Sequence, residues 1–99
     1  MASLYYLRCV YGPGFWKDHE YQIKFRIFYE NSKDSCFVNK KDVIPVNNKF
    51  GLVKIVVKSF EEENVLIEIN NSLEHKKSKF YVPKTEIVEN KSLITSVPK

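Results

Sequence analysis

The segment at residues 49–82, KFGLVKIVVKSFEEENVLIEINNSLEHKKSKFYV, decides the fold of this 99-residue chain. Two β-forming runs, Leu52–Val57 and Val65–Ile69, flank the acidic turn Glu61–Asn64, and a third run, Lys79–Val82, follows a polar segment. Apolar and polar residues alternate along the first two runs, as they do in strands with one buried face. The segment therefore predicts an antiparallel meander.

Valine and isoleucine form the expected inner face of this meander, namely Val53, Ile55, Val57, Val65, Ile67 and Ile69. The opposite face carries Lys54, Lys58 and Glu68. Either lysine could lie across from Glu68, in a cross-strand charge pair worth about 0.2–1 kcal/mol. The predicted strand pairing is therefore consistent on both faces.

Upstream of the meander the sequence predicts four further strands. Leu4–Tyr11 is largely apolar on both faces and is expected to end at the turn-forming Gly12–Gly14. Glu20–Glu30 alternates most clearly, and it forms an expected hairpin with the short run Ser35–Val38. The run Val43–Val46 contains a proline, which cannot donate a ladder hydrogen bond, so this strand is expected at a sheet margin.

The C-terminal part of the sequence gives weaker signals. Thr85–Val88 and Ser92–Thr95 are each compatible with a short closing strand, and Lys84–Asn90 is alternatively compatible with one helical turn. No segment of ten or more residues shows helical periodicity. We therefore expect one all-β domain over residues 1–99, a small antiparallel barrel or sandwich of six to seven short strands, with residues 91–99 frayed.

The sequence FYVPKTEIV, Phe80–Val88, resembles the last-strand signature of Src-homology-type small barrels. In that family an aromatic–hydrophobic–proline step leads through a short helical turn into a closing strand. The resemblance implies a small barrel, but the first-strand acidic-aromatic motif and the paired tryptophans of the family's peptide groove are missing. The expected strand number is also compatible with a partly open barrel of the oligonucleotide-binding type.

Composition places the chain among proteins that fold around their own core, with 43% hydrophobic and 14% aromatic residues. Cys9 and Cys36 are too few for a disulfide framework and lie within expected strands, so both are predicted to be free, buried thiols. The N-terminal apolar run is too short, and too interrupted by Arg8, for a signal peptide or a membrane span. We expect a reducing, cytoplasmic location and no membrane partner.

The net charge is +4, from 16 basic and 12 acidic residues. Only Arg8 and Arg26 are arginines, and arginine is the preferred reader of phosphate and base edges. The charge therefore excludes an acidic mimic of nucleic acid more firmly than it supports a nucleic-acid binder.

Motifs for catalysis and for metal or cofactor binding are missing from the sequence. The three glycines do not form a phosphate loop, and there is no Cys-x-x-Cys or His-x-x-x-His pair. Because these motifs are missing, we expect no cofactor, no metal and no catalytic residues. One alternative stays open, in which a nucleophilic pair joins Cys9 or Cys36 to His19 or His75 in space.

A ribonuclease-like site is the most specific enzymatic alternative. It would combine His19, Glu20, Arg26 and a tyrosine in general acid–base chemistry. The histidines His19 and His75 would be its essential groups. A small nuclease or toxin-like enzyme is thus the third functional hypothesis.

Candidate binding residues cluster upstream of the meander. The loop Phe15–Glu20 holds the only tryptophan, and it is either a binding loop with an aromatic anchor or a plug for an open barrel end. The outer face of the following strand combines cations with an aromatic, as single-strand nucleic-acid binders do. The full candidate set is Phe15, Trp16, Lys17, His19, Lys24, Arg26, Phe28, Lys54 and Lys58.

The leading functional hypothesis is a non-enzymatic binding module that engages a protein partner, as a regulator or an inhibitor. It rests on small size, missing catalytic motifs and aromatics in excess of what one small core needs. The first alternative is a single-stranded nucleic-acid binder that uses the basic residues of the candidate set. A homo-oligomer is a further alternative, because an edge strand near Pro45 or at the C-terminus could pair with a second copy.

Overall fold

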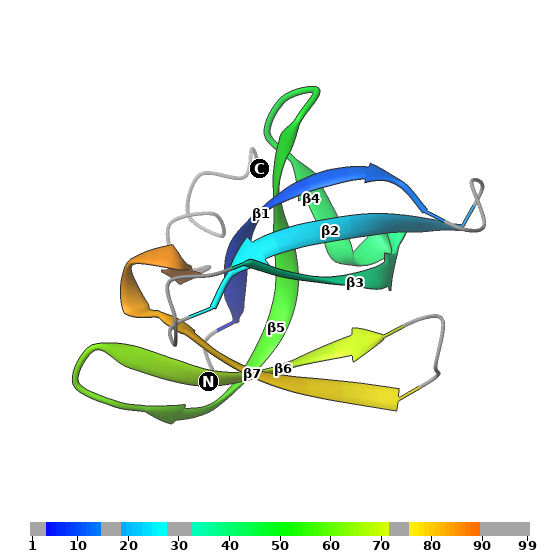
Figure 1. Ribbon diagram of the computed structural model, residues 1–99. Coiled ribbons are helices and arrows are strands. Elements are labelled where there is room, and N and C mark those ends of the chain that lie inside the picture. The colour runs from blue at the N-terminus through cyan, green and yellow to red at the C-terminus, as the bar shows by residue number, and fades with distance from the viewer. Residues whose placement is uncertain (1–3, 15–18, 28–32, 72–75, 90–99) are drawn as a thin grey trace, which may run out of the picture.

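The computed structural model describes residues 4–14, 19–27, 33–71 and 76–89 (Figure 1). Its strands are β1 (Tyr5–Pro13), β2 (Glu20–Arg26), β3 (Lys33–Asn39), β4 (Val43–Pro45), β5 (Phe50–Phe60), β6 (Asn64–Asn71), β7 (Lys76–Pro83) and β8 (Ile87–Glu89). Two 3₁₀ turns, η2 (Lys40–Asp42) and η3 (Lys84–Glu86), precede β4 and β8. Within these ranges there is no α-helix, and the predicted all-β class is confirmed.

All described strand pairs are antiparallel, and the sheet runs in the order β3-β2-β1-β5-β6-β7. The short strands β4 and β8 add to β5 and β1 respectively. The long strand β5 pairs with β1 through Phe50–Ile55 and with β6 through Val56–Phe60. It therefore joins two layers, and the sheet curls into a half-barrel (Figure 1).

The core lies inside this curl. Its buried side chains are Leu7, Cys9, Ile23, Phe25, Cys36, Val38, Val43, Val53, Ile55, Val65, Ile67, Ile69 and Val82. Five of the six residues predicted for the inner face of the meander are among them, and Val57 packs against the cluster while partly buried. Both predicted thiols are free and buried, as expected.

The observed strand ends differ from the predicted ones where pairing overrides local turn signals. β1 continues through Gly12 and Pro13, because these residues pair with Gln22 and Tyr21 of β2. Gly14 follows directly, and a Cβ atom at this position would lie 2.8 Å from the carbonyl oxygen of Glu20. Glycine is therefore required at this close approach of two backbones.

At the C-terminal end, both of the alternatives for the segment after β7 occur in part. Lys84–Glu86 forms one 3₁₀ turn, and Ile87–Glu89 then pairs with β1. The second predicted closing strand, Ser92–Thr95, lies outside the described residues. With the three-residue strands β4 and β8 included, the described chain has eight strands instead of six to seven.

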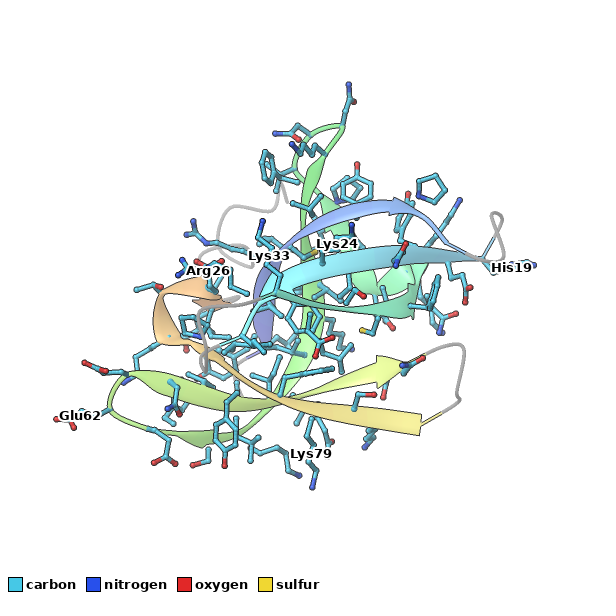
Figure 2. The ribbon with its side chains drawn as sticks, viewed as in Figure 1. His19, Lys24, Arg26, Lys33, Glu62 and Lys79 are labelled. Carbon is cyan, nitrogen blue, oxygen red and sulfur yellow. The ribbon has the colours of Figure 1, made fainter. Side chains whose placement is uncertain are left out.

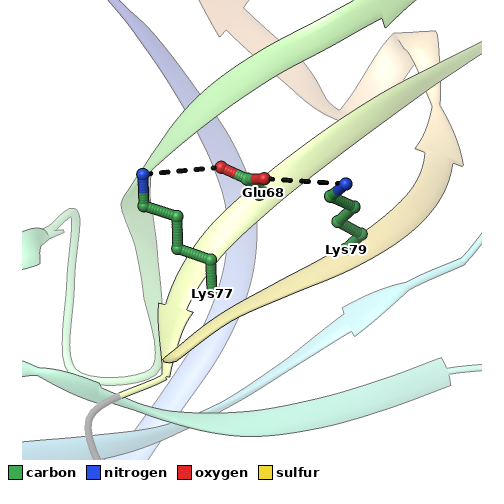
Figure 3. Close-up of polar contacts among 3 residues, drawn as sticks. All are labelled: Glu68, Lys77 and Lys79. Atoms are coloured by element: carbon green, nitrogen blue, oxygen red, sulfur yellow. Dashed lines mark ion pairs between the residues drawn. The ribbon is translucent and has the colours of Figure 1, made fainter. Parts of the chain in front are cut away.

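The predicted charge pair between Glu68 and a lysine of β5 is wrong. Glu68 lies opposite Val56 on β5, and a bulge between Val57 and Ser59 takes Lys58 out of register. Its carboxylate instead lies 3.8 Å from Lys77 Nζ and 4.0 Å from Lys79 Nζ, both on β7 (Figure 3). The Glu68 side chain, expected to be exposed, is thereby covered and only 10% exposed.

Candidate functional site

A groove of about 880 Å³ opens on the outer face of the sheet, over β1, β2 and β5. Among the described residues, five cationic side chains line it, namely Arg8, Lys24, Arg26, Lys33 and Lys49, together with one carboxylate, Glu86. Apolar side chains, among them Val10, Val46, Phe50, Leu52 and Val88, line the space between the charges. The groove is therefore cationic at its walls and apolar between them.

One row of side chains in this groove lies on the face of the sheet opposite the core, because side chains alternate between the two faces along each strand. Phe50 pairs with Val10, and Val10 pairs with Lys24 on the other side of β1. Lys24 in turn pairs with Ser35 of β3. Because directly paired residues point to the same face of a sheet, Phe50, Val10 and Lys24 form a continuous row across three strands.

A second row brings further cations to the same face. Arg26 pairs with Lys33 across β2 and β3, and Arg8 pairs with Leu52 across β1 and β5. Cations gathered on one face of a sheet attract anions. The row is therefore suited to a phosphate group.

The turn between β4 and β5 fixes the remaining wall of the groove. The side-chain oxygen Oδ1 of Asn47 accepts hydrogen bonds of 2.8 Å from the backbone N–H groups of Lys49 and Phe50. The Tyr11 hydroxyl donates to the Asn47 carbonyl oxygen at 2.6 Å, and the Tyr11 N–H donates to the Lys49 carbonyl oxygen at 3.0 Å. These bonds tie the turn to β1 and hold Phe50, whose residue surface is 48% exposed, at the groove.

The carboxylate of the groove comes from η3, the turn that links β7 to β8. Pro83 ends β7 with its φ at −61°, and β8 then begins with Ile87, which pairs with Leu7 of β1. Glu86 is half-buried and lies one step beyond this pair, toward Arg8. Within the described part of the chain, no basic side chain lies at ion-pair distance from it.

Two of the nine predicted binding residues, Lys24 and Arg26, line the groove. Lys54 and Lys58 are exposed on β5 outside it, and Lys54 borders a separate cavity of about 60 Å³ beside Glu68. His19 is exposed at the opposite end of β2 from Arg26 (Figure 2). The other predicted residues, Phe15, Trp16, Lys17 and Phe28, lie outside the described residues.

Sequence reasoning missed four residues that define the groove: Arg8, Lys33, Lys49 and Phe50. Arg8 lies on the face of its strand opposite the buried Leu7 and Cys9, so alternation was a usable signal. Lys33 and Phe50 stand at the first positions of their strands, and Lys49 lies in the turn before β5. The groove depends on the pairing of β1 with β2 and β5, and neither pairing was predicted from the sequence.

The predicted ribonuclease-like constellation is not assembled. Glu20 is buried at the start of β2, and Arg26 ends the same strand, roughly 20 Å away at about 3.3 Å per residue. The exposed His19 precedes Glu20 and is therefore also distant from Arg26. The other histidine of this hypothesis, His75, lies outside the described residues.

Neither cysteine has the environment of a nucleophile. Burial raises the pKa of the Cys9 thiol to about 12, with a further increase from Cys36. Burial likewise raises the pKa of Cys36 to about 12, with a further increase from Asp34. Both thiols are therefore protonated at neutral pH, whereas a nucleophilic cysteine requires the thiolate.

The described ranges contain no group of three or more His, Cys, Asp or Glu side chains that could hold a metal ion. Among the same residues, no helix has the length and apolar character that crossing a membrane requires.

No protein family model matches the chain, and neither a curated protein nor a solved structure is significantly similar to it. The groove itself therefore carries the functional argument.

Proposed function

We propose that this protein binds single-stranded nucleic acid in the groove over β1, β2 and β5. The observation that carries the proposal is the combination of five cations with an apolar floor and an exposed aromatic ring. Lysine and arginine attract the phosphate backbone, while aromatic and apolar side chains stack against bases. This is the first alternative from the sequence, supported by a surface that the sequence showed only in part.

A single strand suits this groove better than a duplex because the apolar floor needs accessible base faces. Phe50 lies in a row with Val10 and Lys24, so a base on Phe50 would have its phosphate within reach of cations. In a duplex the base faces are stacked on one another and only their edges and the backbone are exposed. The Lys49 ammonium, 5.7 Å from the centre of the Phe50 ring, adds a positive charge at this position.

Binding of a protein partner, as a regulator or an inhibitor, is our second candidate function. It is favoured by an apolar area on the outer face of β5, β6 and β7, where Val56 is 50% and Tyr81 39% exposed. Leu66 lies opposite Tyr81 and completes this area. In either case we place the protein in the reducing cytoplasm, because its two buried thiols are free.

Fluorescence anisotropy of a labelled 15-nucleotide oligothymidine, titrated at several salt concentrations, tests the proposed function. We expect binding at low ionic strength, with an affinity that falls linearly in a double-logarithmic plot against salt. Lys24→Ala and Arg26→Ala should each weaken binding and reduce the slope by about 0.7, the value for one phosphate of a single strand. Lys58→Ala is the matched control, since Lys58 is an exposed cation of β5 that does not line the groove.

Phe50→Ala separates stacking from charge attraction. Removal of the ring should weaken binding by about 1–3 kcal/mol and leave the salt slope unchanged, because no phosphate contact is lost. An oligonucleotide that shows no change in anisotropy at low salt would exclude the proposed function. Equal losses for Lys24→Ala and Lys58→Ala would show nonspecific attraction to the whole molecule instead of a groove.

A further inference from the structure

We propose that Glu86 selects the base in this groove and that, together with Arg8, it favours guanine. This inference rests on the proposed function and adds a base preference to it. Of the six charged residues in the described part of the chain that line the groove, Glu86 is the one carboxylate and the other five are cations. A carboxylate at this position repels phosphate and so lowers the affinity for the backbone of any nucleic acid.

The surroundings of Glu86 leave its carboxylate open to a ligand. It is half-buried in η3, and no basic side chain in the described ranges forms an ion pair with it. An ionised carboxylate only accepts hydrogen bonds, so its favourable contacts on a nucleic acid are N–H and O–H groups. Base edges of an unpaired strand present N–H donors directly.

Guanine matches a carboxylate better than the other bases do. Its N1–H and N2–H₂ groups are adjacent parallel donors, and two parallel hydrogen bonds to one carboxylate are the geometry of strong bidentate pairs. Adenine and cytosine offer a donor beside an acceptor nitrogen, and thymine offers one N–H between two carbonyl oxygens. An acceptor beside the donor faces the second carboxylate oxygen and repels it, so only guanine satisfies both oxygens.

Arg8 supplies the complementary group on the same wall of the groove. Leu7 pairs with Ile87, so Glu86 lies one step beyond this pair in the direction of Arg8, and the side chains of Arg8 and Glu86 both line the groove. Arginine is the commonest donor to the acceptor atoms O6 and N7 of guanine. Arg8 and Glu86 therefore offer a donor and an acceptor to opposite parts of one guanine, while Phe50 offers a stacking surface.

The backbone around Glu86 makes this position well defined. Pro83 fixes the chain at the entry to η3, and the Lys84 N–H donates to the Glu63 carbonyl oxygen at 3.0 Å. At the exit, Val88 pairs with Tyr6 of β1. Because the turn is anchored on both sides, Glu86 can discriminate between bases without ordering a flexible loop first.

Competition with short oligonucleotides tests this inference. A labelled 15-nucleotide oligothymidine is displaced from the full chain by the pentamers TTGTT, TTATT, TTCTT and TTTTT. We expect TTGTT to compete about five- to tenfold better than the other three. In Glu86→Gln this preference should disappear, while TTTTT should bind more tightly than to the wild-type protein because a negative charge is gone.

Glu89→Gln is the matched control, because it removes one charge from β8 at an exposed position that does not line the groove. This variant should keep the preference for TTGTT. Equal competition by all four pentamers in the wild-type protein would overturn the inference. It would also be overturned if the preference survived in Glu86→Gln, or if Glu89→Gln lost it equally. Failure of every oligonucleotide to bind is a different result, which would overturn the proposed function itself.

Discussion

Among the residues that the structure describes, the fold changes the acid–base chemistry of the two cysteines most. Cys9 and Cys36 are buried on the core face of β1 and β3, where desolvation disfavours the thiolate and raises the pKa of each to about 12. The Cys9 thiol also lies 3.6 Å from the Gly51 carbonyl oxygen, as a weak donor. Both groups therefore contribute to stability only as neutral thiols.

We expect the two thiols to make the protein less stable at high pH. The ordinary pKa of a cysteine in the unfolded chain is 9.0, whereas the pKa of each folded thiol is about 12. Between these values the unfolded state loses protons that the folded state keeps, so the free energy of unfolding falls as pH rises above 9. The loss should be about 1 kcal/mol per pH unit for each thiol. Denaturant unfolding measured from pH 7 to pH 11 checks this expectation.

A double variant, Cys9→Ala with Cys36→Ala, isolates the contribution of the two thiols to this pH dependence. The variant should be less stable at pH 7, because two buried side chains become smaller, yet its stability should depend less steeply on pH above 9. Identical pH slopes for the two proteins would contradict the assignment of this dependence to the cysteines.

At the scale of elements, the turn between β4 and β5 positions one wall of the groove. Asn47 is the centre of this turn, since its side chain accepts two backbone hydrogen bonds and its carbonyl oxygen accepts a third from Tyr11. Asparagine is suited to this role because its side-chain oxygen can mimic a backbone carbonyl group in a turn. Lys49 and Phe50 therefore depend on Asn47 for their positions.

Asn47→Ala should weaken both the turn and oligonucleotide binding. Loss of the acceptor leaves two exposed backbone N–H groups to water, at a cost of about 0.5–1.5 kcal/mol in stability. The dissociation constant for oligothymidine should rise because Phe50 is no longer held in place. Asn47→Asp keeps the acceptor and should keep the stability of the wild-type protein. Denaturant unfolding and anisotropy on both variants measure the two effects, and unchanged binding in a destabilised Asn47→Ala would show that the turn has no positioning role.

Several elements could be predicted from local sequence and several could not. The alternation in β2, β5 and β6 identified these strands and their buried faces, because the side-chain period of a strand is two. The strand ends and the partner of Glu68 could not be predicted in this way. Glu68 has neighbours on both sides, β5 and β7, and the bulge that removes Lys58 from its register is set by tertiary pairing. Local patterns thus specify which face of a strand is buried, and pairing specifies what each exposed residue meets.

At the scale of the whole molecule, the groove exists because β1 has three partners. Arg8, Lys24 and Phe50 lie up to 42 positions apart in the sequence, and they line one groove only once β2 and β5 have paired with β1. The sequence predicted the outward cations of β2 and its hairpin with β3, and the structure confirms this pairing, but the pairing of β1 with β2 and β5 was not predicted. The groove therefore depends on which strands pair, whereas the all-β class follows from the alternation of apolar and polar residues within each strand.

One core joins both layers of the half-barrel, so we expect the protein to unfold as a single unit. Ile23 of β2 and Ile67 of β6 lie in different layers, and both are fully buried in the same cluster. Ile23→Val and Ile67→Val should each lower the free energy of unfolding by about 0.5–1.5 kcal/mol, since each removes one buried methylene group. Ile44→Val is the control, because Ile44 is 39% exposed and should change stability much less.

For each variant, circular dichroism and tyrosine fluorescence during denaturant unfolding should give the same midpoint, shifted together from the wild-type value. The slope of the transition should also stay the same, because the surface exposed on unfolding is unchanged. Separate midpoints for the two probes, or two resolved transitions in Ile67→Val, would contradict a common core. In that case β5 would connect two layers that lose their structure independently, and binding in the groove over β1, β2 and β5 would persist after the β6–β7 layer had unfolded.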